Sequence, residues 1–263
     1  MKHLQALWVY RYFILSSIKT EFKTRLARSR LGILWIVIHP LAQVAIYAFV
    51  LSAVLSSKLP GIDSRYAYAI YLMAGMASWT LFLEVMNRSL MVFIDNANLL
   101  KKMAFPKLTL PLIVAGSSLL SNLILIGAVL VVFGLLGHFP LQSLQWLPLL
   151  ILLTLLLALS LGLILGIIHV FLRDIGQLMP MLLQLWFWLT PIVYMSTIIP
   201  EQFHSILALN PMLPVVIAYQ AVLAYGNAPD LLSLLYPCLL TLGMLCLASW
   251  MYLKANEEMV DVL

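Results

Sequence analysis

Six long apolar stretches run through the 263-residue chain, and each is about as long as a membrane-spanning helix. They cover residues 33–57, 67–94, 107–136, 146–171, 175–199 and 232–253. A helix needs roughly 20 mainly apolar residues to cross a bilayer, and inside the bilayer every backbone N–H and C=O must be paired within the protein. We therefore predict an all-α polytopic membrane protein with six transmembrane helices.

The composition excludes other classes of protein. Hydrophobic residues make up 63% of the chain and charged residues 10%, whereas soluble domains average about 45–50% and about 25%. A soluble enzyme could not cover such a chain with polar groups, and disorder requires low hydrophobicity. The net charge of +5 could suggest nucleic acid as a partner, but the charges are too few, so we predict none.

A seventh apolar stretch, at about 206–225, is too short to cross a membrane. Asn210-Pro211 and Pro214 interrupt it, and further prolines flank it on both sides. Apolar helices of about a dozen residues are typical of re-entrant or interfacial segments. We therefore predict a short outer re-entrant helical hairpin over residues 200–229.

The basic residues predict the orientation, because cytosolic loops carry an excess of Lys and Arg. With both termini in the cytosol, only Lys58 and Arg65 of the 15 lie outside. Charged residues continue to Arg30 and the first apolar run is too long for a signal peptide, so we expect no cleaved leader. The inside set is Lys2, Arg11, Lys19, Lys23, Arg25, Arg28, Arg30, Arg88, Lys101, Lys102, Lys107, Arg173 and Lys254.

Residues 1–30 combine a helical apolar stripe with a basic cluster. This pattern predicts an amphipathic helix on the inner leaflet, where anionic lipids attract basic side chains. Arg11 and Lys19 fall inside the stripe and would have to extend toward water; an ordinary topology signal is the alternative. The stripe is Leu4, Trp8, Tyr12, Leu15, Ile18, Phe22 and Leu26, and the basic cluster is Lys19, Lys23, Arg25, Arg28 and Arg30.

Glu84 and Arg88 are charged residues inside the second apolar stretch. Glu ahead of Arg at i, i+4 is the favourable order for an ion pair, and charges at this depth usually face a cavity or the protein interior. They could line a polar conduit or lock a gate, or they could pin two helices together, since buried pairs are weak evidence for either role.

Aromatic residues gather in the first, second and fifth stretches. Aromatic faces can stack on sugar rings, so the cluster predicts a conduit, while interfacial belts and packing remain alternatives for any single residue. The set is Trp35, Tyr47, Phe49, Trp79, Phe82, Trp186, Phe187, Trp188 and Tyr194.

Four small or weakly polar positions are expected to serve packing. Gly162 and Gly166 form a GxxxG pair that permits close helix contact. His39 and His169 are interpreted as hydrogen-bonded packing residues, because no chain of Asp, Glu and His suitable for proton transport is present.

The loop between the second and third stretches could dock a soluble partner. Pro106 marks the start of the next helix, and two leucines with basic neighbours precede it. A plain basic loop is the alternative. The docking candidates are Asn96, Asn98, Leu99, Leu100, Lys101 and Lys102.

Several chemical motifs are absent from the sequence. There is no GxxxxGK[ST] for phosphate, no GxSxG nucleophile and no His/Cys cluster for a metal. Cys238 and Cys246 are about 12 Å apart on a helix, too far for a disulfide. We therefore expect no cofactor on this chain and no enzymatic activity, so that a partner must supply any energy.

Together these motifs resemble the ABC-2 type polysaccharide exporter permeases, in order and over nearly the whole chain. The entry segment matches at residues 23–35 and His39-Pro40-Leu41. The second span and its loop match at residues 71–75, Trp79, 98–102 and Phe105-Pro106, and the fifth span and hairpin match at Arg173-Asp174, residues 186–194 and Asn210-Pro211.

The resemblance implies a homodimeric permease in the bacterial inner membrane that binds two copies of a separate ATPase subunit, which would hold ATP and Mg. The complex would export a lipid-linked polysaccharide, with O-antigen preferred over capsule or teichoic acid. The interfacial helix would cover 1–30, the transmembrane domain 31–256 and a cytosolic tail 257–263. The loop at 95–105 would engage the ATPase, with the cytosolic turn Arg173-Asp174 nearby; spans one, two and five would border the conduit, and the outer helices would form a gate.

Three other functions remain open from the sequence. An ABC-2 exporter of a small molecule or drug is the nearest alternative. A membrane glycosyl or acyl transferase would normally need convergent carboxylates or histidines, which the sequence does not suggest. A membrane scaffold without transport is made less attractive by Glu84 and Arg88.

Overall fold

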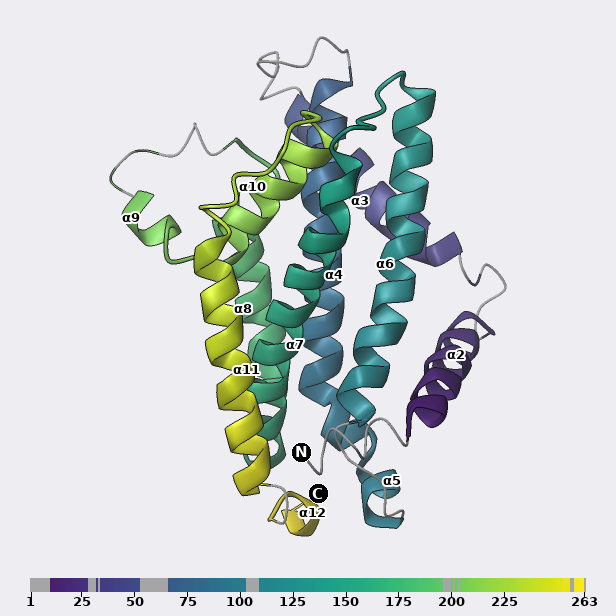
Figure 1. Cartoon of the computed structure of the whole chain (residues 1–263), viewed down its shortest axis with the longest axis vertical. Helices are drawn as coiled ribbons and strands as arrows, with labels where there is room; N and C mark the ends of the chain where they lie inside the picture. Colours follow the sequence, from purple (N-terminus) through teal and green to yellow (C-terminus); the bar gives the residue numbers. More distant parts are fainter. Residues whose placement is uncertain are drawn as a thin grey trace.

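The computed structural model describes residues 10–27, 32, 34–52, 66–102, 109–195, 200, 202, 204–255 and 258–262. Every regular element in these residues is a helix, as predicted. The longer helices run side by side in a bundle, with short helices at its two ends (Figure 1).

Four long helices form the bundle. In the described part of the chain, these four are long and apolar enough to cross a membrane. They coincide with the predicted second, third, fourth and sixth spans, and a turn of 3-10 helix, η1 (Leu144–Trp146), precedes the third of them. They are α4 (Ala67–Asp95), α6 (Thr109–Leu135), α7 (Leu147–Phe171) and α11 (Leu235–Ala255).

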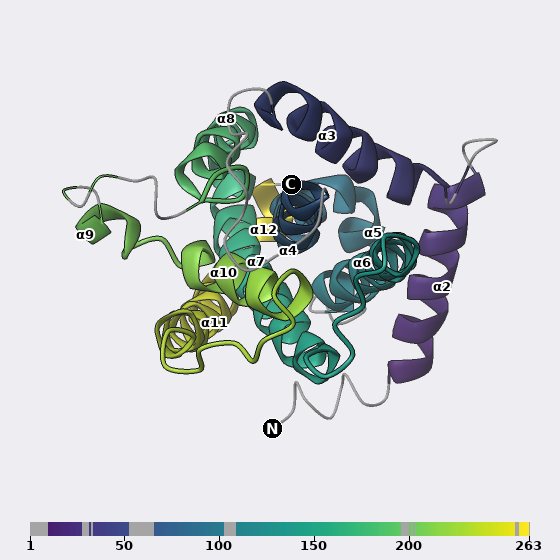
Figure 2. The ribbon, with the colours of Figure 1, turned by 90° about the horizontal axis from the view of Figure 1, so that it is seen from above.

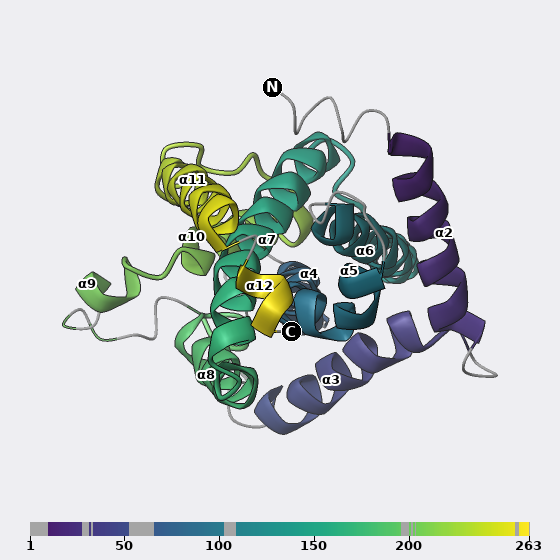
Figure 3. The same cartoon turned by 90° about the horizontal axis from the view of Figure 1, so that it is seen from below.

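Two shorter helices occupy the predicted first and fifth spans. The first is α3 (Leu34–Ser52), whose predicted continuation to 57 lies outside the described residues. Figures 2 and 3 show it lengthwise where α4 and α6 appear end-on, so it crosses the bundle obliquely. The other is α8 (Ile175–Leu189), which has 15 residues.

The prediction of one helix over 175–199 is wrong for residues 190–195, which are not helical, while residues 196–199 lie outside the described residues. Pro191 has no N–H to donate and its ring restricts the residue before it to extended conformations. Thr190 accordingly has φ −106° and ψ 129°. At about 1.5 Å per residue, α8 is roughly 22 Å long, shorter than the roughly 30 Å of a hydrocarbon core.

Helix α4 lies at the centre of the bundle, with α3, α6, α7, α8 and α10 (Met212–Leu223) around it (Figure 2). The closest neighbour is α7, because a Cβ added at Gly162 would lie 2.6 Å from Ser89 Cβ, and one at Gly166 would lie 2.6 Å from the Ser89 carbonyl oxygen. The GxxxG prediction of close packing is therefore confirmed.

The predicted outer hairpin consists of a single turn, α9 (His204–Leu207), followed by α10. Tyr219 and Val215 on α10 are fully buried, and α10 contacts both α4 and α7. The helix is therefore packed within the protein and does not lie free on its surface.

The N-terminal helix α2 (Arg11–Ala27) packs along α6. Of the predicted apolar stripe, Tyr12 and Leu15 are 71% and 63% exposed, whereas Ile18 packs on α6 beside Glu21, which also faces the protein. That this helix lies on the inner leaflet stays a prediction. Lys19 and Lys23 are exposed and Arg25 lies within the helix, whereas Arg28 and Arg30 lie outside the described residues.

Two short helices lie together at one end of the bundle (Figure 3). They are α5 (Ala97–Lys102) and α12 (Glu258–Val262).

Between α7 and α8 a three-residue turn brings His169 against Gly176, and His169 Nδ1 lies 3.3 Å from the Leu90 carbonyl oxygen. His169 is thus a packing residue. Cys238 and Cys246 are both free thiols.

Candidate functional site

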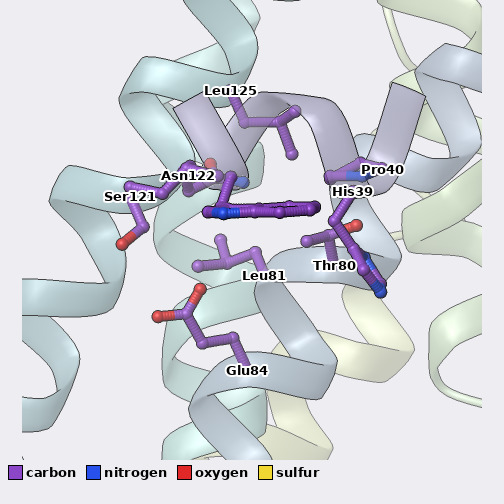
Figure 4. A pocket seen from close by; sticks show the side chains of 10 residues that line it. His39, Pro40, Thr80, Leu81, Glu84, Ser121, Asn122 and Leu125 are labelled. Atoms are coloured by element: carbon purple, nitrogen blue, oxygen red, sulfur yellow. The ribbon is translucent and has the colours of Figure 1, made fainter. Parts of the chain in front are cut away.

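A polar pocket of about 170 Å³ opens between α3, α4 and α6. Glu84 points into it from α4, while Ser121 and Asn122 come from α6 (Figure 4). Trp35, Ile36, His39 and Pro40 from α3 line it together with Thr80, Leu81 and Leu125.

A second pocket of about 110 Å³ lies between α3, α4 and α8. It shares His39 and Thr80 with the first, so the two pockets are adjacent along the α3–α4 contact, and we refer to the pair as the crevice. The lining of the second pocket is His39, Gln43, Tyr47, Met76, Trp79, Thr80, Leu83, Gln184 and Phe187.

Most of the polar residues of this crevice were missed from the sequence. His39 was interpreted as a packing residue, yet it lines both pockets. The spacing of polar residues within the apolar helices indicates this crevice. His39 and Gln43 are four residues apart, as are Thr80 and Glu84, and residues four apart lie on the same face of a helix.

Asn122 contributes a buried acceptor to the first pocket. The residue is 3% exposed, and its Nδ2 donates to the Ala77 carbonyl oxygen at 3.2 Å. Its Oδ1 has no hydrogen-bond partner among the described residues. A buried acceptor without a donor is costly.

The predicted Glu84–Arg88 ion pair is present, with 3.5 Å between Oε1 and Nη1. Arg88 also forms an ion pair with Glu21 of α2, and its Nη1 donates to Ser118 Oγ at 2.7 Å. Glu21 was missed, because helical spacing reveals neighbours on one helix and not contacts between distant segments.

The aromatic residues divide into two groups. Trp35, Tyr47 and Trp79 line the crevice. Phe82 is fully buried and lies in edge contact with Trp186, at 5.1 Å between ring centroids. Both rings therefore take part in the packing of α4 against α8.

The remaining predicted conduit residues lie elsewhere. Phe49 is 83% exposed on α3, away from both pockets. Trp188 is half exposed and contacts Tyr47 edge-on, while the Tyr194 hydroxyl donates to the Trp188 carbonyl oxygen at 2.8 Å.

Asn210 connects the end of α8 to the start of α10. Its Oδ1 accepts from Trp186 Nε1 at 2.8 Å and from the Met212 N–H at 3.0 Å, and its Nδ2 donates to Thr190 Oγ1 at 2.9 Å. Three hydrogen-bonding groups therefore meet at one side chain, which ties the end of α8 to the start of α10.

At the other end of the bundle, α5 presents fewer side chains than the docking hypothesis expected. Leu100 is buried in a cluster with Phe93 and Met259, and Leu99 packs against the same cluster. Leu100 is therefore an anchor of α5, and the prediction that it is presented to a partner is wrong.

Polar groups of α5 and of the neighbouring turn remain available. Asn98 and Lys101 are exposed, as are Arg173 and Asp174. Asn96 Nδ2 donates to the Val92 carbonyl oxygen at 2.8 Å and continues the α4 helix end. Lys102 is the last residue of α5.

Comparison with known proteins gives a consistent picture. Residues 12–224 match the family described as ABC-2 type transporter. The O-antigen export system permease protein RfbA of Myxococcus xanthus is 28% identical over 260 residues, 98% of each chain. RfbA of Klebsiella pneumoniae is 29% identical over 82% of each chain. The polysialic acid transport protein KpsM of Escherichia coli is 25% identical over 91% of this chain and 92% of its own.

Proposed function

The chain belongs to the ABC-2 type transporter family, and from that premise we propose that it is the permease subunit of an exporter of lipid-linked polysaccharide. The names of its relatives, which are O-antigen and polysialic acid transport proteins, support this substrate class. O-antigen is the preferred substrate, because relatives of that name align over as much as 98% of the chain.

The permease crosses the inner membrane six times as a homodimer, with both termini in the cytosol. The four long helices account for four crossings. Helix α3 supplies a fifth, and α8, which is shorter than the hydrocarbon core, supplies the sixth together with the chain that follows it. Lys101 on α5, Arg173 in the turn after α7 and Lys254 at the end of α11 lie toward the end of the bundle that carries α5 and α12. Their placement supports a cytosolic position for that end.

Two copies of a separate ATPase subunit drive export. The sequence contains no phosphate-binding GxxxxGK[ST] motif, so ATP and Mg are bound by the partner. The exposed Asn98 and Lys101 on α5, with Arg173 and Asp174, form the contact surface. The basic residues of α2, including Lys19 and Lys23, face the lipid headgroups of the inner leaflet.

The crevice between α3 and α4 is the part of the conduit that this chain contributes. The observation that carries this proposal is the chemistry of its lining: the Glu84 carboxylate and Asn122 Oδ1 accept hydrogen bonds, and Trp35 and Tyr47 offer aromatic rings. Sugar rings present hydroxyl donors at their edges and C–H groups on their faces, so acceptors beside aromatic rings suit them.

Depletion of the protein from its native cell tests the proposed function. We expect lipid-linked polymer to accumulate on the cytosolic face, with none at the surface, because synthesis continues while export stops. Failure of the polymer to form would instead favour a transferase. Normal surface polymer would favour export of a small molecule, which a drug-accumulation assay would then detect.

A further inference from the structure

Arg88 is shared between two carboxylates from different helices. Its guanidinium forms an ion pair with Glu21 of α2, and Nη1 lies 3.5 Å from Glu84 Oε1 on its own helix. The side chains of Arg88, Glu21 and Glu84 are 21%, 36% and 17% exposed. Because charges with little surrounding water interact strongly, the division of Arg88 between the two acids matters for both.

The position of Glu21 is set by contacts with α6 and not by Glu84. Ile18 packs directly against Gly116, where a side chain would collide with it. Ser117 Oγ also donates to Glu21 Oε1 at 3.4 Å. Glu21 is therefore held beside Arg88 by the packing of α2 on α6.

Glu84 is the member of this cluster that lines the pocket of about 170 Å³. Arg88 lies one helical turn farther along α4 and is bound on its other side by Glu21 and by Ser118 of α6. The charge that Glu84 presents in the pocket thus depends on how fully Arg88 pairs with it.

We propose that Glu21 is a positioning residue of the conduit, which acts through Arg88 on the charge and orientation of Glu84. The inference rests on the proposed function of the crevice. With Glu21 in place, the Arg88 guanidinium is divided between the two carboxylates, and Glu84 lines the pocket. Without the Glu21 carboxylate, the guanidinium turns fully onto Glu84, forms the two-bond pair that Arg and a carboxylate favour, and withdraws it from the pocket.

Carbodiimide labelling tests, without any transport assay, whether Arg88 pairs more fully with Glu84 when the Glu21 carboxylate is removed. Dicyclohexylcarbodiimide is apolar and modifies protonated carboxyl groups within membranes, and a carboxylate paired with Arg resists protonation. We expect Glu21→Gln to lower the labelling of Glu84 about fivefold or more, and Arg88→Gln to raise it. Ser16→Ala, at an exposed position on α2, should leave labelling unchanged. Unchanged labelling in Glu21→Gln would overturn the proposal.

A double-mutant cycle on export tests whether Glu21 acts through Glu84. Glu21→Gln should slow export about tenfold in the wild-type background and less than about twofold in a Glu84→Gln background, because groups in one network are not additive. Glu21→Asp should retain most of the activity. Equal factors in the two backgrounds would show that Glu21 acts independently of Glu84.

A disulfide between α2 and α6 separates this role from simple anchoring. A Cβ at Gly116 would lie 3.0 Å from Ile18 Cγ1 and 3.5 Å from Ile18 Cγ2. The Ile18 Cβ is bonded to both of these atoms, so the distance between the two Cβ atoms falls within the roughly 3.5–4.5 Å of a disulfide. We therefore choose Ile18→Cys with Gly116→Cys. The pair is made with Cys238 and Cys246 replaced by Ser.

With α2 locked in this way, Glu21→Gln should still show weak Glu84 labelling and slow export. Full recovery of both by the disulfide would mean that Glu21 only anchors α2. If the wild-type protein exports no polysaccharide, the proposed function fails, while the labelling of Glu84 still decides this inference.

Discussion

Asn122 combines a hydrogen-bonded amide nitrogen with a buried oxygen that lacks a partner in the described part of the chain. Its amide nitrogen is bonded to the α4 backbone, whereas its Oδ1 is buried beside the pocket without a partner in the described part of the chain. An unpaired buried acceptor costs about 1–3 kcal/mol. A hydroxyl group from the substrate would satisfy it.

Replacement of Asn122 by Leu should therefore separate stability from transport. The loss of one hydrogen bond and the removal of the unpaired oxygen nearly cancel, so the free energy of unfolding should change by less than about 1 kcal/mol. Export should fall severalfold. Thermal unfolding and an export assay measure the two effects, with Leu123→Ala, which is exposed on the same helix, as the control. Unchanged export would remove Asn122 from the conduit.

Trp35 offers a second test on the same pocket. It is half exposed and lines the pocket, so Trp35→Ala should slow export about tenfold, as expected for the loss of one stacked ring, without loss of assembly. Ile46→Ala removes an exposed side chain from the same helix and should have little effect. Similar export rates in the two variants would contradict a role for the aromatic ring.

The spacing of residues along the sequence predicts contacts within one helix but not contacts between helices. Glu84 and Arg88 were predicted to pair because they lie one turn apart, and they do. Glu21 and Ser118 complete the cluster from two other helices, and no periodicity in the sequence connects those helices. The same limit explains why Phe82 and Trp186 were grouped with ring residues that do line the crevice.

At the scale of elements, the packing of α7 on α4 depends on two glycines. A Cβ at Gly162 would lie 2.6 Å from Ser89 Cβ and 3.1 Å from the Met86 carbonyl oxygen, so the helices would have to separate. Gly243 on α11 has nothing within 4 Å of such a Cβ. Gly162 and Gly243 can therefore be compared directly, because an added Cβ would collide at Gly162 and meet nothing at Gly243.

Gly162→Ala should destabilise the protein by about 1–3 kcal/mol through overpacking. Gly243→Ala should be neutral or stabilising by up to about 1 kcal/mol, since Ala is the better helix former. Thermal unfolding in detergent compares them. Equal effects would mean that α4 and α7 do not touch at Gly162.

The end of α8 is held by the hydrogen bonds of Asn210. Asn210→Ala removes three hydrogen bonds, each worth about 1 kcal/mol, and should lower the free energy of unfolding by about 3 kcal/mol. Asn210→Asp keeps the acceptor for Trp186 and Met212 and should retain part of that stability. Indole fluorescence of Trp186 should shift in the alanine variant only, and a shift in both or in neither would contradict this assignment.

One prediction at this scale failed for a physical reason. The apolar run at 175–199 contains Pro191, but hydropathy alone does not say whether a proline bends a span or ends it; here the helix ends at Leu189. The helix predicted in the N-terminal segment is present from Arg11 to Ala27, whereas its contact with the inner leaflet stays a prediction. The four long spans were predictable because length and composition suffice for them.

At the scale of the whole molecule, the short helices and basic residues define two different ends. Helices α5 and α12 lie at one end, and the segment between α10 and α11 lies at the other (Figure 1). Asn98 and Asp230 are exposed at these two ends.

Cysteine labelling should place the two ends on opposite sides of the membrane. In a chain without Cys238 and Cys246, Asn98→Cys should react with an impermeant maleimide only after the membrane is opened. Asp230→Cys should react in intact spheroplasts. The reverse pattern would invert the proposed orientation, and reaction of both in intact spheroplasts would contradict the six-span topology.

The central claim is that this chain forms the path by which lipid-linked polysaccharide crosses the membrane. The most direct measurement uses inverted membrane vesicles that contain the protein and its ATPase, with labelled lipid-linked polymer added outside. On addition of ATP, the polymer should become protected from an added glycosidase, and Trp35→Ala should slow that protection. ATP hydrolysis by the complex without any protection of the polymer would contradict the account.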